Sequence, residues 1–277
     1  EELCSLNPAT DRLTFSVVWR VNGATGDILH EWFGRTVINS AVKLSYEHAQ
    51  MFIEQPQQTS FDPAQFPSIR APFDLNEHIR SSVLNMHRIA QRLRAKRFAN
   101  GCLVLNQAKM SFVLNREAGG LPYAYSVYEQ KDSNRLVEEF MLLANIAVAH
   151  RIYGQYPGKA VLRRHPAPNE SQLKLLGESI RQCGGLGLDL VDLSSSGAIQ
   201  TLMQSVQANA GAADPTTALT LTCLLSKTMQ LAQYFCSGQE QLSQADFFHY
   251  GLAVPLYTHF TSPIRRYPDI LVHRLLG

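Results

Sequence analysis

The first part of the chain alternates apolar and polar positions in a way that predicts a β-hairpin followed by a helix. Residues 13–19 and 28–38 are rich in β-branched and aromatic side chains and alternate in part, which is typical of strands. Turn-forming residues occupy 22–26, so the two strands are predicted to pair. Ser45 is a preferred N-cap residue and predicts a helix that runs to about residue 54.

The pattern then changes to a loop, a long basic helix and short strands. Four prolines within residues 55–74 predict an ordered loop or linker. Apolar residues recur at helical spacing between residues 76 and 98. Short strands are predicted at 103–105, 111–115 and 123–128, with a turn at Gly119 and Gly120.

The second half of the chain is mainly helical. A helix is predicted at 136–152, and its segment 140–148 is apolar on nearly all sides, which is typical of a buried helix. Further helices are predicted at 170–183 and 215–235, and a strand at 256–260 precedes a helix from Ser262. Helices combined with local antiparallel strands predict the α+β fold class.

Composition narrows the class of protein further. The chain has 277 residues, of which 45% are apolar, so it can bury a sizeable core. No run approaches 18 consecutive apolar residues, which excludes a transmembrane helix. No signal-peptide core follows Glu1, and we interpret this start as a processed or truncated end. Five widely spread cysteines without a CxxC motif predict buried free thiols in a reducing compartment.

The basic residues are clustered although the net charge is only +2, too small to indicate a nucleic-acid partner by itself. They gather in residues 88–97, in Arg163-Arg164-His165 and in Arg265-Arg266. Such clusters can bind phosphate groups. They are also common as solvated faces, and this alternative is favoured for the first cluster.

The strongest chemical signal is the C-terminal stretch YTHFTSPIRRYPD at residues 257–269. Ser262 is a preferred N-cap and Pro263 a preferred first helical residue, which would place Arg265 and Arg266 in the first turn. Cations there oppose the helix dipole, at about 0.3–1 kcal/mol each when unpaired. Two arginines beside free backbone amides would suit an anion such as phosphate. The alternative is that Asp269 or another carboxylate pairs with them.

Extended motifs give the chain a family resemblance. The stretch YTHFTSPIRRYPDILVHRLL closely resembles the signature of the RNase II (RNB) family of exoribonucleases. Similar motifs lie upstream: KLSYEHAQ at 43–50, NRLVEEFMLLANIAVAH at 134–150, LRRHPAP at 162–168 and YFCSG at 234–238. In sequence, these motifs are most similar to the eukaryotic, cytoplasmic, exosome-independent branch of the family, which acts on oligouridylated RNA. The resemblance implies that residues 1–277 are the larger, C-terminal part of an RNB catalytic domain.

The resemblance also implies roles for individual residues. Arg265 would contact the phosphate beside the scissile bond and act as the catalytic arginine. Arg266 would be a second phosphate contact, and Ser262, in the same motif, an RNA-binding residue. Glu138 and Tyr46 would together hold a ribose 2′-hydroxyl and so distinguish RNA from DNA.

Each of these assignments has a plainer alternative or a departure from the family pattern. Glu138 could simply be stabilised by the dipole of its helix, although it shares a helix face with Asn145. Leu105 aligns with a phenylalanine that stacks on terminal bases in some bacterial members, so we do not transfer that role. Pro268 replaces a bacterial glycine and is expected about six residues into the last helix, where it would kink it.

The sequence does not provide an obvious metal site. Two-metal phosphodiester hydrolysis needs several converging carboxylates, whereas this chain has only isolated pairs, Glu138-Glu139 and Asp189 with Asp192. The resemblance implies Mg²⁺ as cofactor, with ligands in an acidic segment expected upstream of Glu1. Cold-shock and C-terminal OB-fold domains are likewise expected outside this chain.

Three functions from different classes are compatible with these observations. The first is a metal-dependent 3′-to-5′ exoribonuclease acting on single-stranded RNA, expected to be cytoplasmic, monomeric, without a membrane partner and not an exosome core subunit. The second is a catalytically inactive RNA-binding or scaffold protein that has lost the acidic segment. The third is an α+β interaction module that binds no RNA at all.

Overall fold

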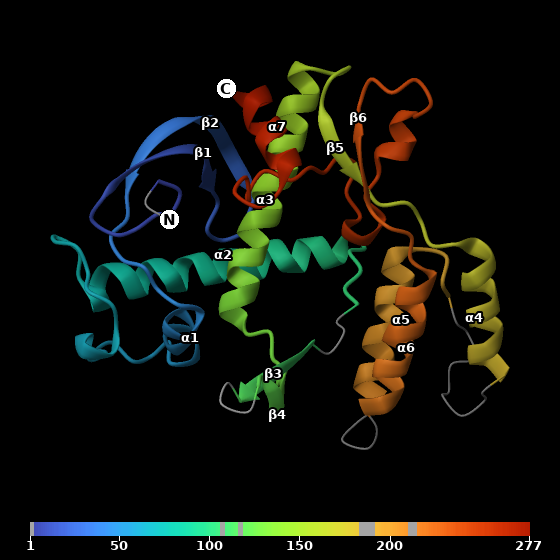
Figure 1. Ribbon diagram of the computed structural model, residues 1–277, viewed down its shortest axis with the longest axis horizontal. Helices are drawn as coiled ribbons and strands as arrows, with labels where there is room; N and C mark the ends of the chain where they lie inside the picture. The colour runs from blue at the N-terminus through green and yellow to red at the C-terminus, as the bar shows by residue number, and fades with distance from the viewer. Residues whose placement is uncertain (1–2, 106–108, 116–118, 183–191, 210–214) are drawn as a thin grey trace.

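The computed structural model describes residues 3–105, 109–115, 119–182, 192–209 and 215–277 (Figure 1). Its described strands form three separate two-stranded antiparallel sheets, and helices make up most of the remainder. The α+β class predicted from the sequence is therefore confirmed. No helix in these ranges is both long and apolar enough to cross a membrane.

The predicted N-terminal hairpin is confirmed. Strand β1 (Asp11–Val21) pairs with β2 (Ile28–Asn39) in antiparallel register. Asn22 closes the turn, since its backbone and side chain both accept hydrogen bonds from residues of the turn. One face of the hairpin presents Phe15, Val17 and Trp19 to the core formed with the C-terminal helix.

Helices α1 and α2 form as their capping residues predict. Helix α1 (Tyr46–Glu54) begins at Ser45, whose hydroxyl accepts from the His48 backbone while His48 Nδ1 accepts from the Ser45 backbone. Asp74 caps a π-helical turn, η2 (Leu75–Ile79), which leads directly into α2 (Arg80–Ala99). The loop predicted between them holds one short 3₁₀ turn, η1 (Pro63–Gln65).

Helix α3 (Asp132–Gln155) is the central element and extends beyond the predicted 136–152 at both ends. It crosses α2 near the middle of the molecule (Figure 1). Leu136 in its first half packs into the core of α1 and α2. Val148 and Ile152 in its second half are fully buried in a different core, which contains the N-terminal hairpin and α7 (Tyr267–Leu276). One helix therefore fixes the two cores relative to each other.

The third core lies between α4 (Glu170–Gln182), α5 (Ser196–Asn209) and α6 (Pro215–Thr228). Helix α4 agrees with the prediction. Helix α5 is not among the predicted elements, although its buried residues recur at helical spacing: Ile199, Leu202, Met203 and Val206.

The predicted helix at 215–235 is wrong in its last part. Helix α6 ends at Thr228, whose carbonyl accepts a hydrogen bond from the Asn169 backbone. Residues Gln233–Cys236 instead form β6, which pairs with β5 (Val161–Arg164). Pairing with a strand about 70 residues earlier overrides the local apolar pattern here. The short 3₁₀ turns η4 (Gln244–Phe247) and η5 (Tyr250–Leu252) follow.

Two predicted strands are also absent. Residues 103–105 and 256–260 are extended but do not join a ladder. Single backbone bonds hold them, from Leu103 to the Gly251 carbonyl and from Arg163 to the Tyr257 carbonyl. Each segment therefore lies beside its neighbour without the repeated bonds of a sheet.

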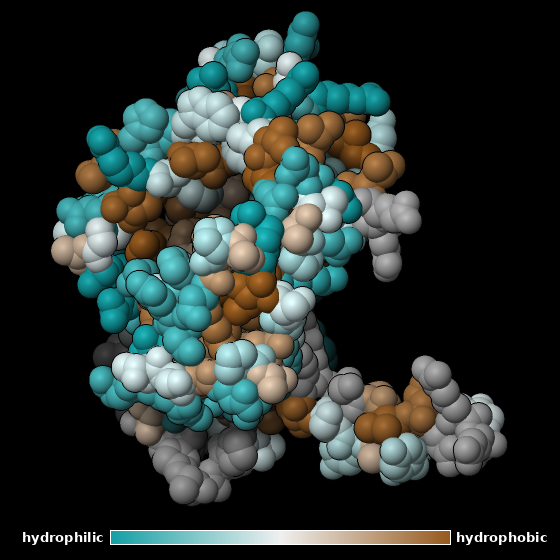
Figure 2. Space-filling view, turned by 90° about the vertical axis from the view of Figure 1, so that its left-hand side faces the viewer, coloured by the Kyte–Doolittle hydropathy of each residue, from teal (hydrophilic) through white to brown (hydrophobic). Residues whose placement is uncertain are grey.

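The strands predicted at 111–115 and 123–128 are confirmed as β3 (Lys109–Asn115) and β4 (Leu121–Tyr128). This hairpin stands apart from the body of the molecule, at the lower right of Figure 2. Large apolar side chains on it are exposed, among them Phe112, Leu121, Tyr123 and Tyr125.

The prediction of buried free thiols is only partly correct. Four cysteines within the described ranges are free, but only Cys102 is buried, while Cys4, Cys223 and Cys236 are exposed. Burial raises the pKa of the Cys102 thiol, although the neighbouring Arg97 guanidinium opposes that effect. Cys183 lies outside the described residues.

Candidate functional site

The C-terminal motif is an extended segment and a turn that the core holds from several sides. Asn145 on α3 donates to the Tyr257 hydroxyl at 3.0 Å and accepts from the Phe260 backbone at 2.9 Å. The Thr258 hydroxyl donates to the Val161 carbonyl on β5 at 2.7 Å. Because Asn145 is almost completely buried, its two bonds fix the motif against α3. The polar helix face noted in the sequence is therefore partly structural.

Aromatic packing holds the next part of the motif against α7 and the N-terminal hairpin. The Phe260 ring stacks on His273 with centroids 4.5 Å apart and meets Phe15 edge-on at 6.1 Å. The His273 Nε2 atom is 2.9 Å from the Phe260 carbonyl. The chain therefore enters the following turn from a fixed position.

The turn itself begins at Ser262, but the last helix begins later than predicted. The Ser262 carbonyl accepts from the backbones of Arg265 and Arg266, and α7 starts at Tyr267 with Arg266 as its N-cap residue. Arg265 thus precedes the helix, and the predicted cost of a cation in its first turn does not apply to it. Pro268 occupies one of the first two helical positions, where no backbone donor is required, so the predicted kink is wrong.

The two arginines of the motif are in different states. Arg266 pairs with Asp269 through two bonds, Nε to Oδ2 at 2.8 Å and Nη2 to Oδ1 at 2.7 Å. Asp269 is fully buried and also accepts from the Ser262 backbone at 2.7 Å. Arg265 is exposed and forms no ion pair or side-chain hydrogen bond with any residue that the structure describes.

Asp269 thus pairs with Arg266, as one interpretation of the sequence allowed for both arginines, and it does not pair with Arg265. The carboxylate of Asp269, in the first turn of α7, is the partner of Arg266 and neutralises its charge. The Ser262 hydroxyl is half-buried and bonds to no other described residue. The roles of these three residues toward RNA remain predictions.

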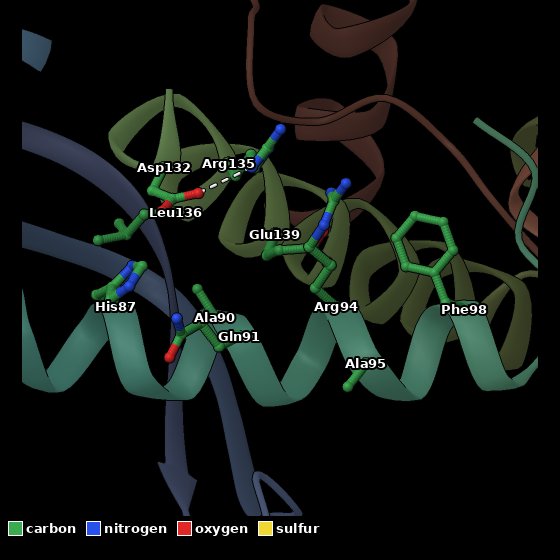
Figure 3. Close-up of a pocket in the computed structure, with 10 residues that line it drawn as sticks. All are labelled: His87, Ala90, Gln91, Arg94, Ala95, Phe98, Asp132, Arg135, Leu136 and Glu139. Atoms are coloured by element: carbon green, nitrogen blue, oxygen red, sulfur yellow. Dashed lines mark hydrogen bonds and ion pairs between the residues drawn. The ribbon is translucent and has the colours of Figure 1, made fainter. Parts of the chain in front are cut away.

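The glutamates of α3 show a similar division. Glu139 is buried and receives hydrogen bonds from Arg97 Nε at 3.1 Å and from Arg97 Nη2. Arg94 also extends toward it from α2, at 3.4 Å (Figure 3). The Glu138 side chain is about one-third exposed. Its Oε2 accepts from Gln130 Nε2 at 3.0 Å, and its Oε1 lies 3.9 Å from Arg97 Nη2. Glu138 therefore keeps acceptor capacity for a ligand.

Beside Glu139 lies a hollow of about 360 Å³ between α2 and α3 (Figure 3). Its α2 wall includes His87, Gln91 and Arg94, and its α3 wall includes an exposed ion pair between Asp132 and Arg135 at 2.9 Å. Burial lowers the pKa of His87, against the attraction of Asp132. Arg94 and Arg97 of α2 thus pair with Glu139 on α3. The solvated-face alternative expected the basic residues of this helix to face solvent, so it is wrong for these two.

Tyr46 is the first residue of α1 and is 46% exposed. On the same helix, Gln50 accepts a bond from the Ser133 backbone at 2.9 Å, which places α1 against the start of α3. Tyr46 and Glu138 thus lie on adjacent helices, without a direct contact between them among the described interactions. Their joint contact with a ribose stays a prediction.

Leu105 and Asp192 are engaged within the fold. Leu105 packs against the core of α5 and α6, so it has a structural role. Asp192 accepts from the Ser194 backbone at 2.8 Å, and Asp189 lies outside the described residues. Over the described ranges, no three histidine, cysteine or acidic side chains converge on one point. These residues therefore do not fit the expected Mg²⁺.

Sequence reasoning missed a further polar cluster, formed by Arg163, Tyr234 and His259. These residues belong to LRRHPAP, YFCSG and the C-terminal motif, and the β5–β6 pairing brings the first two together. The Tyr234 hydroxyl bonds to His259 Nδ1, and the Arg163 guanidinium lies over the Tyr234 ring. Only the resemblance of all three motifs to one family could have indicated the cluster.

Comparison with known proteins identifies the family of the chain. The family model described as "RNB domain" matches residues 1–277. A Xenopus tropicalis protein named DIS3-like exonuclease 2 is 51% identical over 278 residues, which cover 100% of this chain and 32% of that protein. An Arabidopsis thaliana protein named inactive exonuclease DIS3L2 is 44% identical, with 100% of this chain and 25% of the relative covered.

Among solved structures, Mycoplasma genitalium RNase R in complex with ribose-methylated single-stranded RNA has a TM-score of 0.79. It is 23% identical, and the match covers 99% of this chain and 38% of that one, so it supports the fold. The chain spans about a third of the length of the Xenopus relative. With its whole length matched and its signature turn in place, the chain belongs to the RNB-domain family of exoribonucleases.

Proposed function

We propose that the full-length protein is a 3′-to-5′ exoribonuclease that hydrolyses single-stranded RNA to nucleoside 5′-monophosphates, with oligouridylated RNA as substrate in cytoplasmic RNA decay. The observation that carries this proposal is the unpaired Arg265 in a turn whose other groups are fixed. Asp269, Arg266, Asn145 and the Ser262 backbone all have partners within the chain. Arg265 is left with its charge exposed and no described partner.

An exposed arginine in a rigid turn suits a phosphodiester. Its planar guanidinium can bind two phosphate oxygens at once, which a lysine cannot do. If the scissile phosphate lies there, Arg265 stabilises the negative charge that grows on the phosphoryl oxygens during attack. The ion pair of Arg266 with Asp269 holds the turn, so the Arg265 backbone moves little when RNA binds.

Glu138 supplies a second element of the proposal. Gln130 and Arg97 hold its carboxylate while leaving it partly exposed. A carboxylate in this state can accept a hydrogen bond from a ribose 2′-hydroxyl. Tyr46, on the adjacent helix, would complete the contact and make it specific for RNA.

The higher identity to a protein named DIS3-like exonuclease 2 (51%) than to one named exosome complex exonuclease RRP44 (36%) supports independence from the exosome core. The oligouridine preference and the cytoplasmic location are proposed on the resemblance of the motifs alone. A monomeric state and Mg²⁺ as cofactor are proposed on the family resemblance alone. Binding of RNA without hydrolysis remains the second candidate function. A specific observation favours it: a relative named as inactive is as similar, at 44%, as some relatives named as exonucleases.

The test is degradation of a 5′-labelled RNA with a 3′-oligouridine tail by the full-length protein in magnesium buffer. We expect a ladder that shortens from the 3′ end, nucleoside 5′-monophosphates as product and complete inhibition by EDTA. A matched RNA with an oligoadenine tail tests the uridine preference. Tight binding of RNA without any shortening would establish the inactive alternative.

The chain of 277 residues by itself is expected to have no nuclease activity, because its described residues bring no three potential metal ligands together. The same labelled RNA provides the measurement. Shortening by this chain in magnesium, abolished by EDTA, would contradict the expectation.

A further inference from the structure

Three polar side chains from separate parts of the chain meet beside the motif. Arg163 and Tyr234 are directly opposite each other in the β5–β6 ladder, and His259 precedes the turn at Ser262 by three residues. The Tyr234 hydroxyl is 2.5 Å from His259 Nδ1, and the Arg163 guanidinium lies 4.7 Å from the centre of the Tyr234 ring. Tyr234 is 37% exposed and His259 half-buried, so the cluster reaches the surface.

The cluster has an excess of positive charge. Arg163 forms no ion pair with a carboxylate in the described part of the chain. Asp269, whose negative charge acts on His259, is already engaged by Nε and Nη2 of Arg266 and by the Ser262 backbone. Two arginines whose charges act on His259, Arg163 and Arg265, therefore have no counter-ion among the described residues.

His259 is neutral in this environment. Burial lowers its pKa to about 4, and the charges of Arg266, Arg163 and Arg265 contribute in the same direction, against Asp269. A neutral imidazole has one donor nitrogen and one acceptor nitrogen. An imidazole nitrogen is a stronger base than a phenol oxygen, which favours donation by the Tyr234 hydroxyl to Nδ1 and a ring proton on Nε2.

This tautomer leaves a donor available. Among the described residues, His259 Nε2 has no hydrogen-bond partner. A half-buried donor next to uncompensated arginines suits an anion with several acceptor oxygens. A phosphate of the RNA backbone has this chemistry, and it carries no requirement for a particular base.

We propose that His259 Nε2–H and the Arg163 guanidinium bind an RNA backbone phosphate separate from the one at Arg265, with Tyr234 as a positioning residue that fixes the His259 tautomer. This inference rests on the proposed function insofar as the ligand is RNA. It adds a second phosphate contact on the β5–β6 side of the motif.

Two substitutions of His259 distinguish phosphate binding from a purely structural role of the cluster. The asparagine of His259→Asn can accept the Tyr234 bond in place of Nδ1 but does not reach the position of Nε2. The glutamine of His259→Gln places an amide donor near Nε2 but loses the acceptor for Tyr234. If His259 binds phosphate, the glutamine variant keeps RNA affinity and the asparagine variant loses it.

The measurement is affinity of the full-length protein and its variants for single-stranded RNA in EDTA at several salt concentrations, with thermal unfolding in parallel. For a short single-stranded RNA, which makes few other phosphate contacts, we expect His259→Asn to weaken binding about tenfold or more and His259→Gln to weaken it much less. Arg163→Gln should reduce the slope of log affinity against log salt by about one. Lys174→Gln, an exposed change of the same charge on α4, is the matched control and should leave the slope nearly unchanged.

Two results would overturn the inference. One is equal RNA affinity for wild type and His259→Asn, which would make the cluster structural. A loss of affinity confined to His259→Gln and accompanied by lower stability would lead to the same conclusion. The other is absence of RNA binding by the wild type. Because binding is measured without hydrolysis, a protein that binds RNA but does not degrade it would contradict the proposed function and still decide the role of His259.

Discussion

The glutamate doublet of α3 and the arginine doublet before α7 divide their roles in the same way. Glu139 is buried against Arg97, and Arg266 is paired with the buried Asp269. The other member of each doublet, Glu138 or Arg265, keeps exposed surface and ligand-binding capacity. Identical neighbours in the sequence are therefore in different states: one is engaged in the fold, and the other keeps exposed surface.

The two available residues nevertheless differ. Glu138 is held by Gln130 and lies near Arg97, so its carboxylate is already oriented in a helix. Arg265 has no described partner, and only the backbone of its turn is fixed. Binding through Glu138 costs little side-chain ordering, whereas Arg265 must be ordered by its ligand. We therefore expect Arg265 to contribute mainly when charge develops on phosphate.

The largest expected effect is on stability, from Glu139→Ala. This change leaves Arg97 buried without its partner, and breaking a buried ion pair typically costs about 3–5 kcal/mol. Urea unfolding of the chain measures the change, and Glu138→Ala is the matched control with a much smaller expected loss. Similar destabilisation by both substitutions would show that the two glutamates do not divide their roles.

The next effect is on catalysis, from Arg265→Ala in the full-length enzyme. Loss of one transition-state contact of this kind typically lowers the rate by a factor of roughly 100–1000. RNA affinity should barely change, because long RNA makes many other phosphate contacts. Arg265→Lys should restore the rate only in part, since lysine lacks the planar fork. Single-turnover rates and affinity at one salt concentration provide the measurement.

Arg266→Ala is the control for the arginine doublet. It leaves the buried Asp269 carboxylate without its cation, so we expect a lower melting temperature, whereas Arg265→Ala should melt like the wild type. If Arg265→Ala loses affinity in proportion to rate, or unfolds, then Arg265 is a binding or structural residue and the assignment is wrong.

A smaller effect is expected on sugar discrimination. Glu138→Ala and Tyr46→Phe each remove a proposed contact to the ribose 2′-hydroxyl, and a lost hydrogen bond to a charged acceptor costs roughly 1.5–3 kcal/mol. The ratio of RNA to DNA binding by the full-length protein measures it. An unchanged ratio in both variants would return the two residues to a structural role.

The smallest effect is expected for the exposed ion pair of α3. Asp132 and Arg135 are both about 40% exposed, and pairs of this kind contribute about 0.2–0.5 kcal/mol. Urea unfolding of Asp132→Ala should therefore differ little from the wild type. A loss comparable to that of Glu139→Ala would mean that burial does not explain the contrast between the glutamates.

Some of the fold follows directly from local sequence. The N-terminal hairpin, α1, α2 and α3 all form near their predicted positions, because turn residues, capping side chains and apolar spacing act within a few residues. The α+β class and the family signature are determined in the same way. Helix α5 had the same kind of local signal.

Long-range contacts decided the rest. Strands β5 and β6 have four residues each, too few for a local pattern, and they pair across about 70 residues. The start of α7 depends on Asp269, which bonds over short sequence distances to the Ser262 backbone and to Arg266. The full burial of Asp269, however, comes with the packing of α7 against distant parts of the chain. Because the contacts of Asp269 engage Arg266, the Arg265 side chain keeps no partner among the described residues. The sequence determined that two arginines stand together, and only tertiary structure decided which one is available, because a buried carboxylate must be paired and can reach only one of them.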